Sequence, residues 1–88
     1  MHSVYVLMSL KENKFYVGYT ENIEQRVSEH NSGKNVSTQN RRPLKLLYYE
    51  SHLSKQDALK RERYFKTSQG KTTLKQVLSN SLHQHFSG

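Results

Sequence analysis

The sequence predicts a small α+β domain with the element order β-β-α-β-α-α. Near the N-terminus, two short runs of β-branched and aromatic residues flank the polar turn 11–14, a pattern typical of a β-hairpin. Farther along, capping residues precede segments whose apolar residues recur at helical spacing. Strands and helices in this order favour a small sheet flanked by helices. We expect one domain over 1–80 and a disordered tail over 81–88.

The first half of the chain is expected to form the hairpin and one helix. The strands cover 3–8 and 14–19, where apolar and aromatic residues dominate. Thr20 or Asn22 can cap the following helix, because a side-chain oxygen at that position accepts a hydrogen bond from the first turn. The helix is expected to reach about His30, where an Asn-Ser-Gly stretch ends it.

The second half begins with a polar loop and continues with a strand and two helices. The loop over 31–43 is long for so small a domain, and such loops are often functional. The third strand is expected over 44–49. A helix opens after Ser54 and reaches about Lys66, and a Ser-Gln-Gly stretch then separates it from a short helix over 71–78.

The net charge favours a polyanionic partner. The 88 residues carry 14 basic and 7 acidic side chains, a formal charge of +7. Residues 1–31 have a net charge of −1, residues 32–53 of +3 and the remainder of +5. Nucleic acid is the first candidate and an anionic membrane surface the second, since no helix combines a basic face with an apolar one. A basic protein that is merely soluble stays open as an alternative.

The chain contains no cysteine, which excludes disulfides and cysteine-ligated metal sites and suits a reducing, cytoplasmic location. No apolar run approaches the roughly 20 residues of a membrane span. The N-terminus has neither a basic segment nor a long apolar stretch, so no signal peptide is expected.

A glycine stands inside the second strand and raises the question of what comes close to it. Gly18 lowers packing and costs backbone entropy, so a strand that only fills a core disfavours it. Tyr5 and Tyr16 lie on adjacent strands of the predicted hairpin, where cross-strand neighbours touch. The sheet is thus expected to present two phenols beside an open patch of backbone. The alternative is that both tyrosines only pack, as tyrosine commonly does in strands.

Three charged or titratable side chains lie at unexpected places on the predicted helices. Arg26 and His30 stand at i and i+4, along the edge of the apolar face of the first helix. Glu62 falls between Ala58 and Phe65 on the apolar side of the second, where a charge is costly unless a cation meets it. The alternatives are a snorkelling Arg26 and a structural ion pair of Glu62 with Arg26 or another base.

These residue types suit the hydrolysis of a phosphodiester. Glu62 could hold one Mg²⁺ or Mn²⁺ ion, because magnesium keeps most of its water and often takes only one or two carboxylates. Arg26 could brace the phosphate with paired hydrogen bonds. Either Tyr5 or His30 could take the proton from the attacking water.

In this order and spacing, the residues resemble the GIY-YIG nuclease superfamily, over roughly residues 3–78. The closest type is the short standalone bacterial protein similar to the N-terminal domain of the excinuclease C protein. The segments that carry the resemblance are Ser3-Val4-Tyr5, Tyr16-Val17-Gly18-Tyr19-Thr20, Arg26, His30-Asn31-Ser32-Gly33-Lys34, Arg41-Arg42-Pro43-Leu44-Lys45-Leu46 and Ala58-Leu59-Lys60-Arg61-Glu62.

The resemblance implies a three-stranded antiparallel sheet flanked by helices and metal-assisted cleavage of one DNA strand. It implies a divalent metal at Glu62, in a cleft lined by Tyr5, Tyr16, Arg26 and His30. A low sheet surface at Gly18 would then let a phosphate and its metal approach. The chain departs from the family pattern in Ser3, which replaces a glycine, and in loop residues 37–40, where short relatives usually carry a Tyr-Thr-Arg-like stretch.

The function we expect is that of a metal-dependent DNA endonuclease or nickase, in DNA repair or processing, with a protein partner supplying the choice of target. The alternative is a catalytically weak or inactive nucleic-acid-binding module on the same fold. A structural RNA-binding protein would explain the charge but not the cluster. For either of the first two, the expected phosphate contacts are Lys34, Arg41, Arg42, Lys45, Lys60, Arg61, Arg63 and Lys66.

Overall fold

The computed structural model describes residues 1–87 and confirms the α+β class and the order of its elements. Its strands form one antiparallel sheet in the order β2-β1-β3, so the first strand is central. The elements are β1 (His2–Ser9), β2 (Phe15–Thr20), α1 (Ile23–Asn31), the 3₁₀ turn η1 (Gln39–Arg41), β3 (Leu44–His52), α2 (Lys55–Phe65), α3 (Ser68–Val77) and α4 (Ser79–Ser87).

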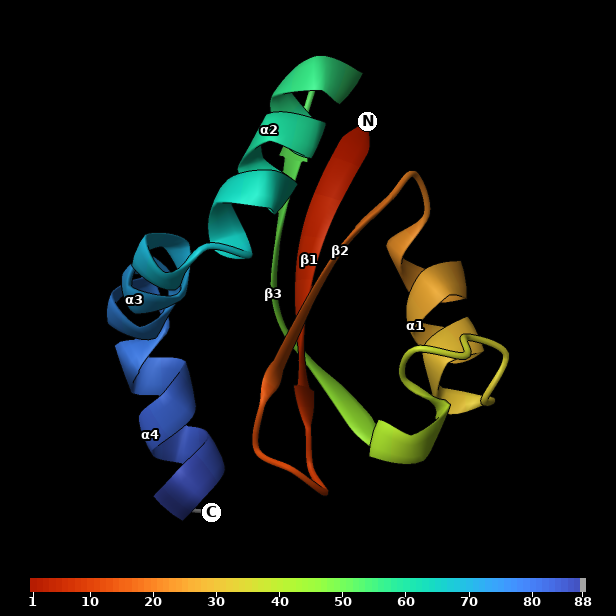
Figure 1. Ribbon diagram of the computed structural model, residues 1–88, viewed down its shortest axis with the longest axis vertical. Helices are drawn as coiled ribbons and strands as arrows, with labels where there is room; N and C mark the ends of the chain where they lie inside the picture. The colour runs from red at the N-terminus through yellow and green to blue at the C-terminus, as the bar shows by residue number, and fades with distance from the viewer. Residues whose placement is uncertain (88) are drawn as a thin grey trace.

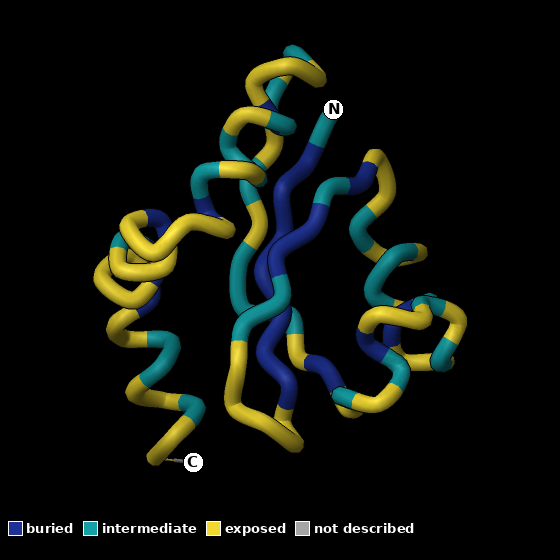
Figure 2. The backbone as a smooth tube through the Cα atoms, viewed as in Figure 1, coloured by how far each residue is buried: buried dark blue, intermediate teal, exposed yellow. Residues whose placement is uncertain are grey.

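Helices cover both faces of this sheet (Figure 1). On one side lies α1 with the loop that follows it, and on the other lie α2, α3 and α4. The central strand is therefore buried on both faces, as Figure 2 shows for β1 in dark blue. Val4 and Val6 of β1 face α2 and α3, while Tyr5 and Leu7 face α1. Alternate residues of one strand thus build two separate cores.

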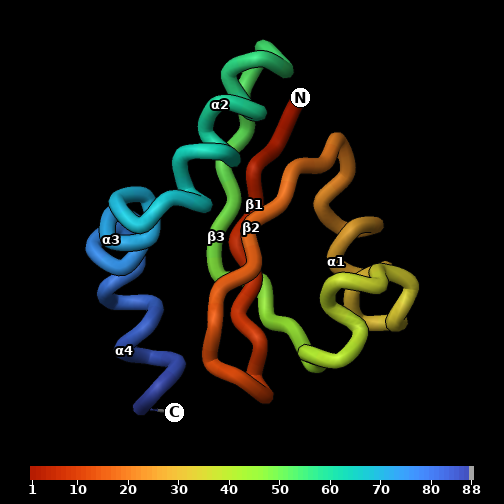
Figure 3. The backbone as a smooth tube through the Cα atoms, in the orientation of Figure 1, coloured from red at the N-terminus to blue at the C-terminus, as the bar shows by residue number. Residues whose placement is uncertain are grey.

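Polar side chains anchor the long loop between α1 and β3 (yellow to green in Figure 3). The amide of Asn31 closes its base, donating to the carbonyl of Leu44 at 3.0 Å and accepting from its N–H at 2.9 Å. At the other end, the hydroxyl of Ser9 donates to the carbonyl of Arg41 at 2.6 Å. These hydrogen bonds fix the end of α1 to the start of β3, and the last part of the loop to β1.

The third helix begins earlier than the sequence predicts, at Ser68 instead of residue 71, and contains Gly70. Thr67 caps it, because its hydroxyl accepts a hydrogen bond from the N–H of Gly70 at 3.0 Å. A Cβ at Gly70 would lie 1.8 Å from the carbonyl oxygen of Tyr64, so this glycine lets α3 start directly against the end of α2. Gly70 thus allows the backbones of α2 and α3 to come close together, and it does not interrupt α3.

The C-terminal residues also differ from the expected disordered tail, since α4 runs from Ser79 to Ser87. Leu82 of this helix packs against the core under the sheet. Gly88 lies outside the described residues. In residues 1–87, no helix is long and apolar enough to cross a membrane.

Candidate active site

The hairpin register places Tyr5 directly opposite Gly18, with Tyr16 next along the same face. A Cβ on Gly18 would lie 2.3 Å from the phenol oxygen of Tyr5. The space above the glycine is thus filled by the tyrosine ring, and the open patch of backbone expected from the sequence is not open. The packing of Tyr5 explains the glycine at position 18, because only a residue without a side chain leaves room for this phenol.

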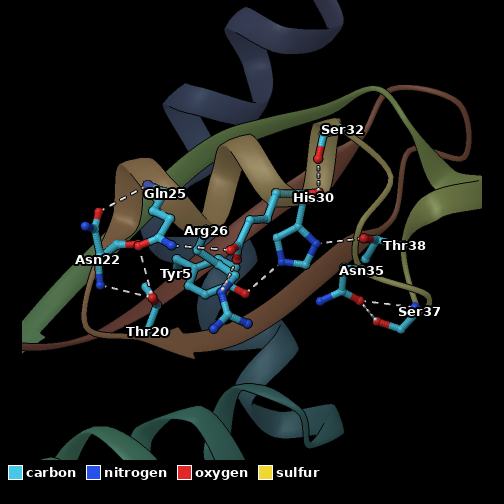
Figure 4. A network of polar contacts seen from close by, with 11 residues as sticks. Tyr5, Thr20, Asn22, Gln25, Arg26, His30, Ser32, Asn35, Ser37 and Thr38 are labelled. Carbon is cyan, nitrogen blue, oxygen red and sulfur yellow. Dashed lines mark hydrogen bonds and ion pairs between the residues drawn. The ribbon is translucent and has the colours of Figure 1, made fainter.

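A chain of hydrogen bonds runs from the sheet through α1 into the loop (Figure 4). The phenol oxygen of Tyr5 lies 2.8 Å from Nε2 of His30, and Nδ1 of His30 lies 2.7 Å from the hydroxyl of Thr38. Tyr5, His30 and Thr38 are each at most 1% exposed. The ring of Tyr16 meets the imidazole edge-on, with ring centres 5.0 Å apart. The cluster therefore holds His30 by both nitrogens and by a ring contact with Tyr16.

Burial sets the protonation of the two titratable groups in this chain. It raises the pKa of Tyr5 well above its usual range, and the neighbouring Tyr16 adds to the effect. The positive charge of Arg26 opposes this rise in the Tyr5 pKa, while the carboxylate of Glu62 adds to it. For His30, burial and then the charge of Arg26 lower the pKa, with Glu29 opposing. Near neutral pH the free protein thus carries a protonated phenol beside a neutral imidazole.

Arg26 lies at the edge of this cluster, at the point predicted from the helical spacing. Its side chain is 39% exposed, and its Nε lies 3.4 Å from a carboxylate oxygen of Glu29, one turn along α1. Of the ion pairs that the sequence left open for Glu62, the pair with Arg26 is therefore not formed, and Glu62 pairs with another base, Lys66. Because an exposed pair such as that of Arg26 with Glu29 contributes little, the guanidinium of Arg26 can turn to a phosphate at small cost.

Glu62 lies on α2, the helix that covers the other face of the sheet. Lys55, two turns earlier on the same helix face, places its Nζ 5.8 Å from the ring centre of Tyr19 on β2, so this face lies toward the edge strand β2. The side chain of Glu62 is 18% exposed, and Nζ of Lys66 donates to its Oε2 at 3.2 Å. The effect of Glu62 on the pKa of Tyr5 places its charge within electrostatic reach of the phenol.

The donor set around Glu62 fits a hydrated divalent ion. Within residues 1–87 no group of three or more acidic, histidine or cysteine side chains could enclose a metal. A single partly exposed carboxylate is the type of ligand that magnesium accepts while keeping most of its water. A flexible, exposed lysine is its hydrogen-bond donor, so Glu62 can exchange this partner for an ion.

The structure divides the expected phosphate contacts into two groups. Arg41 and Arg61 have partners inside the protein: Arg41 pairs with Glu12 at 2.8 Å, and Arg61 with Glu50 at 3.0 Å while lying over the ring of Phe65. The other six are exposed: Lys34, Arg42, Lys45, Lys60, Arg63 and Lys66. Two of these exposed side chains also have a partner, because Arg42 donates to the carbonyl of Gln39 at 2.7 Å and Lys66 to Glu62 at 3.2 Å. A polyanion would therefore meet these six first.

Thr38 is the residue of the cluster that sequence reasoning did not assign. It belongs to the loop stretch 37–40, which the sequence marked only as a departure from the family pattern. No local pattern marks it, because its partner His30 lies eight residues earlier and the two meet only when the loop folds back. It is the only buried residue in the described loop 32–43.

The lowered pKa of His30 predicts a loss of stability on mild acidification. In the unfolded chain this group titrates near its usual value of 6.5, and in the folded protein it titrates at lower pH. Below pH 6.5 the unfolded state then binds more protons, so stability is full above that pH and falls as the pH drops through the folded pKa. We expect the free energy of unfolding, measured by chemical denaturation, to fall with pH in wild type and to lack this fall in His30→Gln. An equal dependence of the unfolding free energy on pH in both proteins would contradict the prediction.

Known proteins resemble this chain over most of its length. The sequence matches the GIY-YIG catalytic domain over residues 1–75. A UPF0213 protein of Staphylococcus haemolyticus is 42% identical over 77 residues, which cover 86% of this chain and 93% of that protein. A UPF0213 protein of Clostridium perfringens is 35% identical over 85 residues, which cover 96% and 90%.

A solved structure shares the fold. The solution NMR structure of a UPF0213 protein from Bacillus halodurans matches with a TM-score of 0.54 at 32% identity, over 86% of this chain and 83% of that one. The fold is thus common to this chain and to a UPF0213 protein of known structure. The chain belongs to the GIY-YIG nuclease family, among the short bacterial UPF0213 proteins.

Proposed function

We propose that the protein is a metal-dependent DNA endonuclease that nicks one strand by hydrolysing a phosphodiester bond, in DNA repair or processing. One observation carries the proposal: the phenol of Tyr5 lies where His30, the charge of Arg26 and the charge of Glu62 all act on it. A protein that only binds nucleic acid has no use for a buried phenol coupled to an imidazole and to an acidic side chain.

We assign the general base to Tyr5. Both nitrogens of His30 already have partners inside the protein, so His30 acts on Tyr5 rather than on water directly. In the free protein the raised pKa keeps the phenol protonated, and the phenol needs added positive charge before it can give its proton to His30. Tyr16 supports the imidazole ring, and Arg26 binds the phosphate oxygens.

Glu62 would hold the ion, one Mg²⁺ or Mn²⁺. When bound there, the metal supplies a Lewis acid for a phosphate oxygen and a positive charge beside the phenol. Glu62 itself contributes the negative charge that retains the ion, and release of Lys66 frees a cation that can contact the phosphate. The exposed lysines and arginines of the loop and α2 would bind the DNA backbone without reading its sequence, so a protein partner would choose the target.

The test is nicking of supercoiled plasmid with Mg²⁺ or Mn²⁺, compared with the same reaction in a chelator. We expect nicked circles only with metal, and a loss of about 100-fold or more for Arg26→Ala, the scale for removing one donor to a developing negative charge. Lys11→Ala serves as control, since it removes one positive charge from the exposed hairpin turn.

The rival binding module makes a different prediction for the same assay. If wild type binds plasmid but cuts no topology with either metal, and Arg26→Ala weakens only the binding, the protein is a binding module. Cutting that persists in chelator would reject the metal dependence alone.

A further inference from the structure

The loop after α1 reaches the site through one side chain. Thr38 is buried, and its hydroxyl lies 2.7 Å from Nδ1 of His30. Arg41, three residues later, holds this part of the loop in place by bonding to Glu12 at 2.8 Å and to the carbonyl of Phe15 at 3.1 Å. The threonine is thus held against the imidazole from the side opposite Tyr5.

A neutral imidazole has one hydrogen to place between two partners, so two arrangements fit these distances. In the first, Tyr5 donates to Nε2, and Nδ1–H donates to Thr38. In the second, Nε2–H donates to Tyr5, and Thr38 donates to Nδ1. Only the first leaves a lone pair of His30 facing the phenol, which is what a proton acceptor for Tyr5 needs.

The surroundings of Tyr5 favour the first arrangement. A phenol is a far stronger acid than an aliphatic hydroxyl, so the better hydrogen bond has the phenol as donor to the imidazole. Arg26, whose charge acts on the phenol, can only donate hydrogen bonds. Among residues 1–87, Nε2 of His30 is therefore the one acceptor that the phenol proton has.

We propose that Thr38 is a positioning residue of the active site: by accepting Nδ1–H, it holds His30 in the tautomer whose Nε2 takes the proton of Tyr5. The proton balance is complete within the protein and the attacking water. The Tyr5 proton moves to Nε2, the imidazole becomes an imidazolium whose Nδ1–H still bonds to Thr38, and the phenol oxygen takes a proton from water. This transfer has a use only in a nuclease, and to that extent it rests on the proposed function.

Nitrogen-15 NMR of the imidazole tests this assignment without any cutting. In wild type at neutral pH we expect Nδ1 protonated and Nε2 bare. Thr38→Val keeps the shape but cannot accept a hydrogen bond, so the proton should move to Nε2 and the tautomer should reverse. Thr38→Ser should restore the wild-type tautomer, and Thr72→Val, the same change at an exposed position on α3, should leave it unaltered.

Plasmid nicking then tests whether the tautomer matters for chemistry. We expect Thr38→Val to lower the rate by roughly 100-fold, the lower part of the range for general acid–base catalysis, and Thr38→Ser to recover most of it. A wild type with Nε2 protonated would overturn the proposal whatever the activity. So would a Thr38→Val variant that nicks at the wild-type rate. If wild type cuts no DNA, the proposed function fails, and the NMR result still decides the assignment of the tautomer.

Discussion

Replacing Glu62 by glutamine is expected to lower metal-dependent nicking by at least about 100-fold, because a catalytic ion contributes several kcal/mol and each 1.4 kcal/mol is a factor of ten. Glutamine keeps the shape of the side chain and removes only its charge. Glu62 is the acidic group whose charge acts on the phenol of Tyr5, and residues 1–87 contain no group of three or more acidic, histidine or cysteine side chains that could enclose a metal.

The same substitution should leave the fold almost untouched. The ion pair of Glu62 with Lys66 is an i,i+4 helix pair whose lysine is 56% exposed, and such pairs contribute about 0.3–0.5 kcal/mol. DNA affinity in chelator should stay the same or rise slightly, since one negative charge is removed. The measurements are initial nicking rates over a range of Mg²⁺ concentrations, denaturation curves and a DNA-binding titration.

A matched control distinguishes the loss of a metal ligand from the loss of any one negative charge. Glu24→Gln makes the identical change at an exposed position of α1 and should nick like wild type. If Glu62→Gln nicks at the wild-type rate and only its free energy of unfolding is lowered, the role of Glu62 is structural.

Replacing Gly70 by alanine is expected to cause the largest loss of stability of any single methyl addition in this fold. The new Cβ would lie 1.8 Å from the carbonyl oxygen of Tyr64 and 2.8 Å from Cα of Phe65. These are backbone atoms at the end of α2, so relief requires one helix to move away from the other. We expect a cost of about 3 kcal/mol or more, at the upper end for overpacking. At roughly 4–8 °C per kcal/mol for a domain of this size, Tm falls by roughly 12–24 °C.

Thermal unfolding measures this effect, and Gln69→Ala is its control. Gln69 is exposed in the same turn of α3, where alanine is a good helix former, so its Tm should change little. A Gly70→Ala variant with unchanged Tm would mean that α3 does not start against the end of α2. Because α2 also carries Glu62, we expect the folded fraction of Gly70→Ala to show reduced nicking.

Local signals in the sequence determined the elements of this protein and most of its candidate site. Strand alternation, the cap at Asn22 and the helical spacing of Glu62 between apolar residues are effects of a few neighbouring residues, and the structure has each of them in place. The period of each element gave the face on which its side chains lie. That Tyr5, Tyr16, Arg26 and His30 share one cluster was what the resemblance to the family implied, and these residues meet in the structure.

Only the tertiary structure decided which partner each polar group and each glycine has. Thr38 reaches His30 because the loop folds back toward α1, and Arg41 pairs at the surface with Glu12, which is 29 residues away. Gly18 is covered by the phenol across the hairpin, and Gly70 sits against a carbonyl of the preceding helix. These partners depend on where distant segments cross, and burial then makes the pairing obligatory, because a polar group without water must find its partner within the fold.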